Sequence, residues 1–99
     1  MSIEDWRTEI DAIDSELLRL LNLRAQLAVK VGESKKAEGL SLCDHERERE
    51  VIERACKANR GPLDERAILK LFRRIIRESR RAEALAMEQL SRQQEGHLR

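Results

Sequence analysis

Residues 3–36 read IEDWRTEIDAIDSELLRLLNLRAQLAVKVGESKK, and apolar side chains recur along this stretch in steps of three and four residues. That spacing places them on one face of an α-helix, as in the seam of a coiled coil. Neither Pro nor Gly interrupts the pattern before Gly32, and the one gap in the seam holds a cation, Arg24. We therefore predict one long amphipathic helix, with apolar positions at Ile3, Trp6, Ile10, Ile13, Leu17, Leu20, Leu27 and Val31.

The length of this predicted helix indicates that the chain needs a partner. At about 1.5 Å per residue it spans roughly 50 Å, whereas a compact chain of about 100 residues has a radius of gyration of about 13 Å. Much of the apolar face would then lie in water, and each exposed Leu or Ile side chain forgoes roughly 1.5–3 kcal/mol of burial. We expect an intertwined homodimer in which a second copy of the chain covers this face.

The rest of the chain predicts two further helices. Asp44 is a favourable N-cap for the second, and Gly61-Pro62 follows its end, because Gly suits a helix C-terminus and Pro cannot continue a helix. Asp64 can cap the third. The fold predicted for residues 1–99 is a single all-α domain of three helices. Its expected segments are a helix over 3–36, a helix over 45–58, a helix from 64 to about Leu90, and a polar tail over 91–99 that frays.

Composition excludes several classes of protein. Apolar residues make up 40% and charged residues 39% of the chain, which is typical of helices with charged outer faces. Strand-forming residues never alternate with period two, so we exclude a sheet. The net charge is only +1, and the arginines between 73 and 81 have no aromatic residues beside them that would stack on bases. We therefore expect no nucleic-acid partner.

Cysteine usage and hydropathy exclude further possibilities. Cys43 and Cys56 form neither a CxxC pair nor a disulfide framework, and His45 has no second ligand pair at metal-binding spacing. We predict no metal and no cofactor. A signal-peptide apolar region and an apolar run of about 18 residues are both lacking. We therefore expect a cytoplasmic protein that does not bind membranes.

Polar residues interrupt the apolar faces of all three predicted helices. On the first helix Arg24 and Lys35 share a face, about 16 Å apart along the axis. Each polar residue on these apolar faces, taken alone, can instead be an ordinary surface cation, helix cap or ion-pair member that points to solvent. Together these polar residues combine cations, carboxyls and one hydroxyl, but they include no nucleophile–base pair. This combination favours a site that binds a small dicarboxylate and acts on it by position and electrostatics. The other members of the set are Asp44, Arg47 and Glu48 of the second helix and Ser79 and Glu83 of the third.

Arg7 bears on the assembly. It lies seventeen residues before Arg24, about 25 Å along the helix, which is too far for both to hold one small ligand. An antiparallel copy of the long helix could bring the partner's Arg7 to Arg24 of this chain. A solvated arginine near the N-terminus is the alternative.

The sequence resembles the all-helical class (type II) of chorismate mutases in five stretches that occur in order and with matching gaps. The likeness extends from about Ile3 to Leu90. The stretches are WRTEIDAID (6–14), LLRLLNLR (17–24), VGESK (31–35), DHERE (44–48) and FRRIIRES (72–79).

The resemblance implies conversion of chorismate to prephenate by a Claisen rearrangement, in the biosynthesis of Phe and Tyr, on a homodimer with two shared sites. It implies that Lys35, Glu83 and Arg24 are catalytic, with Glu83 facing the ether oxygen. It also implies that Ser79 helps at a carboxylate. The residues implied to hold the two substrate carboxylates and polarise the ether are Arg7 of the partner, Arg24, Lys35 and Arg47. Asp44 (through its backbone) and Glu48 are implied to meet the ring hydroxyl.

Two residues depart from the family pattern, and two other functions remain open. Glu83 stands where many relatives carry Gln, and it can donate to the ether only when protonated. Arg80 stands where an apolar side chain is expected, so it either points outward or alters substrate entry.

An isochorismate pyruvate lyase shares this fold, although Asp44 and the Arg47-Glu48 pair favour the mutase. A non-catalytic helical dimerisation or regulatory module would need none of these charged residues.

Overall fold

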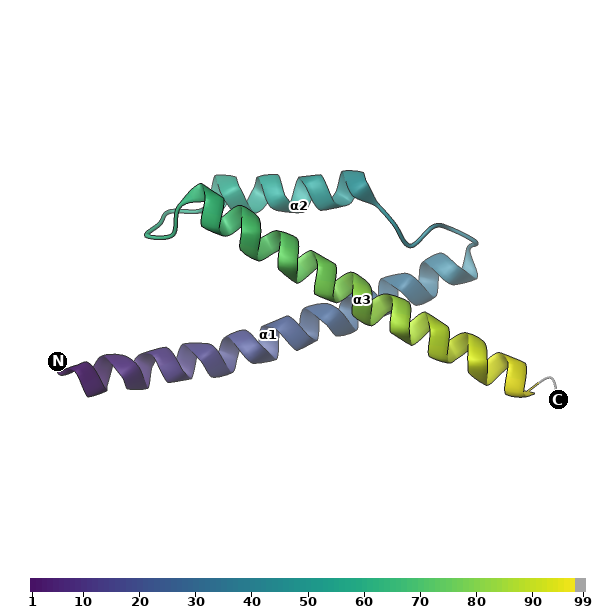
Figure 1. The fold of residues 1–99 in the computed structure, drawn as a ribbon, viewed down its shortest axis with the longest axis horizontal. Coiled ribbons are helices and arrows are strands. Elements are labelled where there is room, and N and C mark those ends of the chain that lie inside the picture. Colours follow the sequence, from purple (N-terminus) through teal and green to yellow (C-terminus); the bar gives the residue numbers. More distant parts are fainter. Residues whose placement is uncertain (98–99) are drawn as a thin grey trace.

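The computed structural model describes residues 1–97, which form three helices joined by two loops (Figure 1). The described part of the chain contains no strand, so the predicted all-helical class is confirmed. The helices are α1 (Ile3–Ala37), α2 (His45–Ala58) and α3 (Glu65–His97).

The predicted bounds of the first two helices agree closely with the structure, but the predicted end of the third near Leu90 is wrong. α3 continues to His97, and contacts from the end of α1 reach it as far as Ser91. The Lys36 ammonium donates to the Ser91 hydroxyl and to the Met87 carbonyl oxygen, the latter at 3.5 Å. Residues 98–99 of the predicted tail lie outside the described residues.

Side-chain caps fix where the helices begin. The Asp44 carboxylate accepts a hydrogen bond from the backbone N–H of Arg47 at 3.0 Å, and Asp64 accepts from that of Ala67 at 2.8 Å. Both caps were predicted from the sequence and are confirmed. α1 ends where Gly39 takes a φ of +72°, a conformation that favours glycine. This turn starts the loop that carries the chain across to α2.

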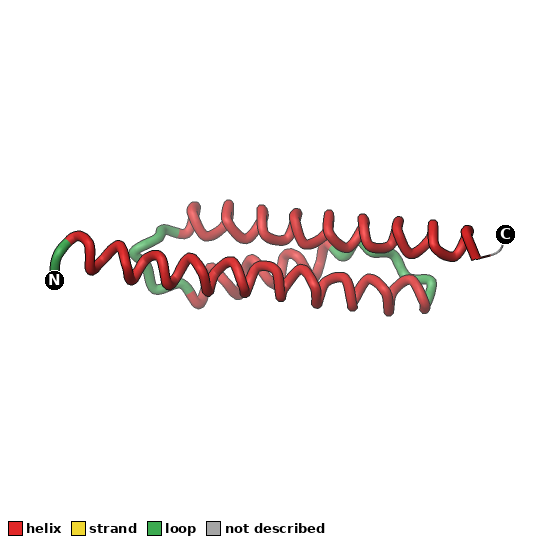
Figure 2. The backbone as a smooth tube through the Cα atoms, turned by 90° about the horizontal axis from the view of Figure 1, so that it is seen from below, coloured by secondary structure: helices red, strands yellow, loops and turns green. Residues whose placement is uncertain are grey.

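α3 is the helix that connects the structure. It packs against both α1 and α2, whereas within residues 1–97 the backbones of α1 and α2 do not come close to each other. α3 crosses α1 and runs beside α2 (Figure 1), and the edge-on view shows α3 in one layer above α1 (Figure 2). The chain is long and flat, with extents of 64 × 29 × 15 Å and a radius of gyration of 17.7 Å.

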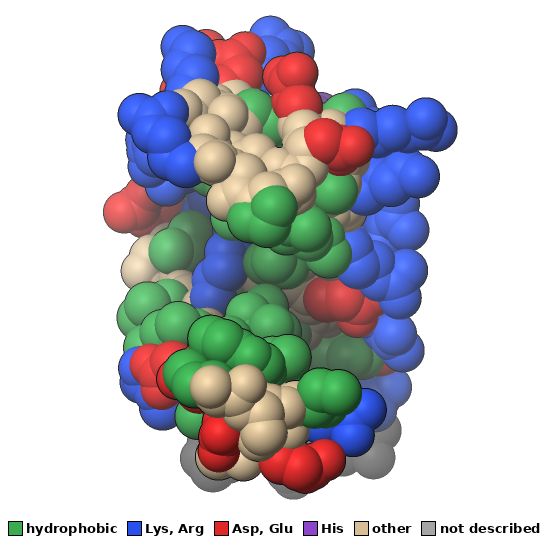
Figure 3. Space-filling model, turned by 90° about the vertical axis from the view of Figure 1, so that its left-hand side faces the viewer, with side chains coloured by type: hydrophobic (Ala, Val, Ile, Leu, Met, Phe, Trp, Pro, Cys, Tyr) green, Lys and Arg blue, Asp and Glu red, His purple; other side chains and the backbone are tan. Residues whose placement is uncertain are grey.

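The single chain has almost no hydrophobic interior. Among the residues whose burial is described, Met87 is the only buried hydrophobic one. The apolar face of α1 lies open: Trp6 is 52% exposed and Ile13 is 64% exposed. The end-on view in Figure 3 also shows hydrophobic side chains gathered at the surface. No helix within residues 1–97 is long and apolar enough to cross a membrane.

Candidate functional site

A cavity of about 320 Å³ lies where α3 crosses α1 and faces α2. Its walls combine aliphatic side chains, such as Val31 and Ile76, with charged groups from all three helices. Every site residue predicted from the sequence lines it except Arg7. These residues are Arg24, Lys35, Asp44, Arg47, Glu48, Ser79 and Glu83.

α1 supplies two cations to one side of the cavity. The Arg24 guanidinium donates to the Ser79 hydroxyl at 2.7 Å, which fixes the arginine against α3. One contact of the Lys35 ammonium is the Leu42 carbonyl oxygen at 3.5 Å, a long hydrogen bond that leaves its other donors available. Both side chains are partly buried, so their charges act in a medium less screened than water.

The first turn of α2 forms the opposite wall. Asp44 uses one carboxylate oxygen, Oδ1, to cap the helix. Arg47 lines the cavity, but its guanidinium pairs with Glu50 at 3.4 Å, and both side chains are more than half exposed. Arg47 is thus in place, but it has to turn inward to hold a ligand.

Arg80 lines the same cavity and forms an ion pair with Glu48. The sequence left open whether this arginine points outward, and the structure places it at the site. The Glu48 side chain is 26% exposed and also lies 3.8 Å from the His45 ring. Arg80 therefore links α3 to α2 across the cavity and holds the Glu48 carboxylate.

Glu83 is the most unusual residue of the site. It is only 7% exposed, and its Oε1 is buried without a hydrogen-bond partner in the described structure. Burial raises the pKa of the Glu83 carboxyl, and the nearby charges of Lys35 and Arg80 oppose that rise. The neutral, protonated form of this side chain is favoured to a higher pH than in water, and in that form it donates a hydrogen bond.

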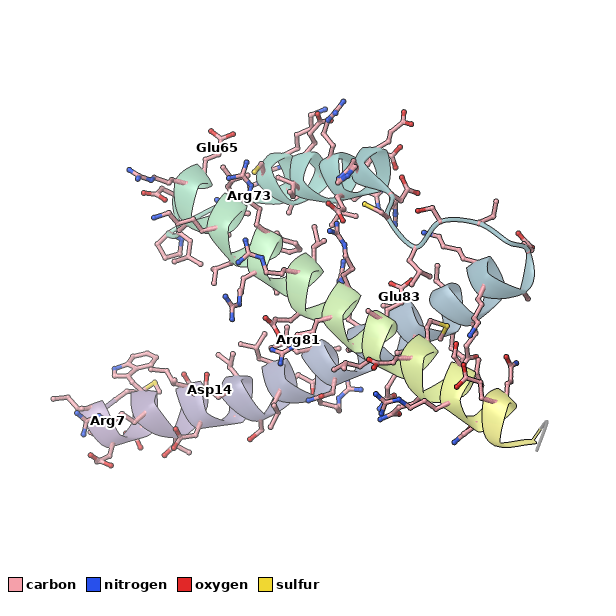
Figure 4. All side chains as sticks on the ribbon, turned by 45° about the vertical axis from the view of Figure 1, so that its right-hand side comes forward. Arg7, Asp14, Glu65, Arg73, Arg81 and Glu83 are labelled. Atoms are coloured by element: carbon pink, nitrogen blue, oxygen red, sulfur yellow. The ribbon has the colours of Figure 1, made fainter. Side chains whose placement is uncertain are left out.

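Arg7 does not reach the cavity of its own chain. It lies near the N-terminal end of α1, and Glu83 lies where α3 crosses the other half of that helix (Figure 4). The Arg7 guanidinium is exposed and pairs with Glu4 at 3.3 Å. The structure thus brings together all the predicted site residues except this one.

One residue at this crossing, Gly32, was not predicted from the sequence to belong to the site. It is the buried residue of α1, and it packs against the Glu83 side chain. The available signal was a glycine inside a predicted helix, where glycine is unfavourable relative to alanine by about 0.5–1 kcal/mol. Such a glycine calls for a packing or functional explanation.

The cavity suits a small organic anion. Among its lining residues there is no Cys or His, and the Ser79 hydroxyl is paired with an arginine rather than with a base. That set offers no activated nucleophile. It does offer fixed cations beside a buried carboxyl, an arrangement that orients an anionic ligand and stabilises charge that develops on it.

Known proteins are similar to this chain in both sequence and fold. The family model of chorismate mutase type II matches residues 6–84. A bifunctional chorismate mutase/prephenate dehydratase from Aquifex aeolicus (strain VF5) is 41% identical over 78 residues, which cover 75% of this chain and 22% of that protein. One from Neisseria gonorrhoeae (strain ATCC 700825 / FA 1090) is 42% identical over 82 residues, covering 83% of this chain and 21% of that protein. The chain thus spans about a fifth of the length of these relatives.

One solved structure matches this chain over nearly the whole length of the solved structure. The structure of chorismate mutase (form II) from Thermus thermophilus superposes with a TM-score of 0.81 and 34% sequence identity. The match covers 83% of this chain and 93% of that one. These similarities give no support to the lyase or to the non-catalytic module. The family model covers most of the chain, and its relatives match in sequence and in fold, so the chain belongs to the chorismate mutase type II family.

Proposed function

We propose that the protein catalyses the rearrangement of chorismate to prephenate. The observation that carries this proposal is the cavity at the helix crossing, where Arg24 and Lys35 face the buried Glu83 carboxyl. Family membership supports the same activity. The reaction breaks an ether bond and forms a carbon–carbon bond within one molecule, so it requires neither a base nor a covalent intermediate.

The proposed mechanism is conformational restriction with electrostatic stabilisation. Arg24, Arg47 and Lys35 hold the two substrate carboxylates, which folds a flexible dianion into the reactive chair. Ser79, fixed by Arg24, assists at a carboxylate. Lys35 and protonated Glu83 donate to the ether oxygen, where negative charge develops as its bond breaks.

The acidic side of the cavity is assigned to the ring hydroxyl. Glu48, held by Arg80, accepts from that hydroxyl. Asp44 contributes through its backbone, while one oxygen of its carboxylate caps α2. These contacts orient the ring. The negative charge that develops on the ether oxygen is stabilised from the other side of the cavity.

We propose that the active form is an intertwined homodimer. The support is the open apolar face of α1 together with the near absence of a core in one chain. Arg7 of the partner then completes each site, because Arg7 of the same chain lies too far away (Figure 4). A cytoplasmic location stays a prediction of the sequence.

The activity is tested by following absorbance with chorismate and, separately, with isochorismate as substrate. We expect chorismate to be consumed and prephenate to form, and no pyruvate to be released from isochorismate. Pyruvate release without mutase turnover would refute the proposal.

The shared site is tested by mixing Arg7→Ala and Arg24→Ala chains. Each variant alone should be nearly inactive, and the mixture should recover activity, because one site of the heterodimer holds both arginines. Chain exchange is checked independently with differently tagged chains. Exchange without recovery of activity would contradict the contribution of Arg7 across the interface.

A further inference from the structure

Gly32 occupies a position where the backbone does not require glycine. Within the described residues, the glycines with positive φ are Gly39 and Gly61, so Gly32 has an ordinary helical conformation that any residue adopts. Glycine inside a helix is less stable than alanine. The reason for glycine at this position therefore lies in what packs against it.

The side chain that lies nearest to the space beside Gly32 is that of Glu83. A Cβ atom built on Gly32 would lie 2.5 Å from Cγ, 2.8 Å from Oε1 and 3.0 Å from Cδ of Glu83. The Cγ atom belongs to the stem of the glutamate, so it cannot give way unless the side chain rotates. That rotation would carry the carboxyl away from its place between α1 and α3.

The position of this carboxyl determines both its direction and its environment. Oε1 lies against α1 at Gly32, buried and without a hydrogen-bond partner in the described structure, on a side chain that lines the cavity. A rotated carboxyl would meet more water and would change its distance to every charge around the cavity. Those charges come from α1 (Arg24, Lys35), from the start of α2 (Asp44, Arg47, Glu48) and from α3 (Arg80).

We infer that Gly32 is a positioning residue for the Glu83 carboxyl: the missing side chain leaves the space that holds this acid between α1 and α3, aimed at the cavity. Gly32 does not itself line the cavity, so it acts through Glu83. The inference rests on the proposed function for its catalytic meaning, but the contact itself can be measured without any substrate.

The test is a double-mutant cycle of Gly32→Ala and Glu83→Ala, read by thermal unfolding of the full chain. We expect Gly32→Ala to lower the melting temperature of the parent, because the new methyl group meets the Glu83 stem. In the Glu83→Ala background we expect the same change to raise the melting temperature, because only the helix preference for alanine remains. Gly96→Ala is the matched control, since Gly96 lies in α3 with no atom near its added Cβ, and it should not lower stability in either background.

Kinetics separate a positioning role from a purely structural one. Gly32→Ala should lower kcat on the order of 10²-fold, as expected for a misplaced catalytic group, with a much smaller change in KM. Its pH–rate profile should decline at lower pH than that of the parent, because the displaced carboxyl is hydrated and gives up its proton more easily. Gly96→Ala should keep the parent kcat and profile.

Three results would count against the inference. A rise in melting temperature on Gly32→Ala in both backgrounds would show that Glu83 does not occupy this space. The expected thermal cycle with unchanged kcat and pH profile would remove the positioning role. A folded parent without mutase activity would overturn the proposed function and this role with it, while the thermal cycle would still report the contact.

If Gly32→Ala fails to fold alone, the Gly32→Ala/Glu83→Ala chain decides the question. We expect it to fold at least as well as Glu83→Ala. Failure of that double variant to fold would overturn the inference, because no glutamate remains to obstruct the methyl group.

Discussion

Replacing Glu83 by Gln tests the proposed proton donor directly. The amide has nearly the shape of the acid, but it donates a hydrogen bond at every pH. The carboxyl donates only while protonated, and as a carboxylate it would repel the charge that develops on the ether oxygen. We therefore expect turnover of the parent to fall as pH rises through the pKa of Glu83, and turnover of Glu83→Gln to stay level.

The size of the effect follows from the surroundings of the carboxyl. At 7% exposure and with Oε1 unpaired, burial raises the pKa of Glu83 above its ordinary value, against the opposing charges of Lys35 and Arg80. Above that pKa the protonated fraction falls about tenfold for each pH unit. Loss of one donor of this kind costs about 10²–10³ in rate, which limits the total decline of the parent.

The assay is a pH–rate profile of both proteins between about pH 4.5 and 9 at saturating chorismate, with folding followed by circular dichroism. Stability supplies an independent reading. A carboxyl whose pKa is higher in the folded state than in the unfolded state gives a contribution that is present at low pH and lost as pH rises through the folded pKa. Glu83→Gln should therefore gain stability relative to the parent as pH rises. A flat parent profile, or the same decline in Glu83→Gln, would refute the assignment of Glu83 as donor.

Substitutions at three further positions test the rest of the site and the proposed dimer. Arg24→Ala should lower kcat/KM by about 10²–10³ with helicity unchanged, and Arg24→Lys should recover only part of the loss, because Lys lacks the planar fork that fits a carboxylate; full activity in either variant would contradict the role. Arg80→Ala should raise KM by at most about fivefold, since its ion pair with Glu48 is partly exposed. The same change removes a cation that lowers the pKa of Glu83, so the decline with pH should move to higher pH, and an opposite shift would contradict the arrangement. Ile13→Glu places a charge on the open face of α1 and should abolish both the dimer in sedimentation and the helical signal, so a folded, active variant would argue against the homodimer.

The sequence was sufficient for the elements whose signal is local. Helix periodicity runs from Ile3 with a single gap at Arg24, and the caps at Asp44 and Asp64 are short-range hydrogen bonds that depend on a few neighbouring residues. The polar residues on apolar faces, Arg24 and Ser79 among them, predicted a common site because a helix fixes which of its side chains share a face.

What the sequence could not supply depends on contacts between distant residues. Lys36, far away in sequence, binds Ser91 just past the predicted end of α3. The place of Arg80 depends on Glu48 reaching it from another helix. The role of Gly32 becomes visible only when the Glu83 side chain is found in the space where a Cβ would lie.

The near absence of a core in one chain has a consequence for thermodynamics. With Met87 as the only buried hydrophobic residue described, the proposed second copy would supply most of the apolar burial that offsets chain entropy. Folding and association then form a single equilibrium governed by mass action. Each tenfold dilution reduces the stability of the assembly by about 1.4 kcal/mol. The midpoint of unfolding should accordingly depend on protein concentration, and a value measured at one concentration does not describe the protein at another.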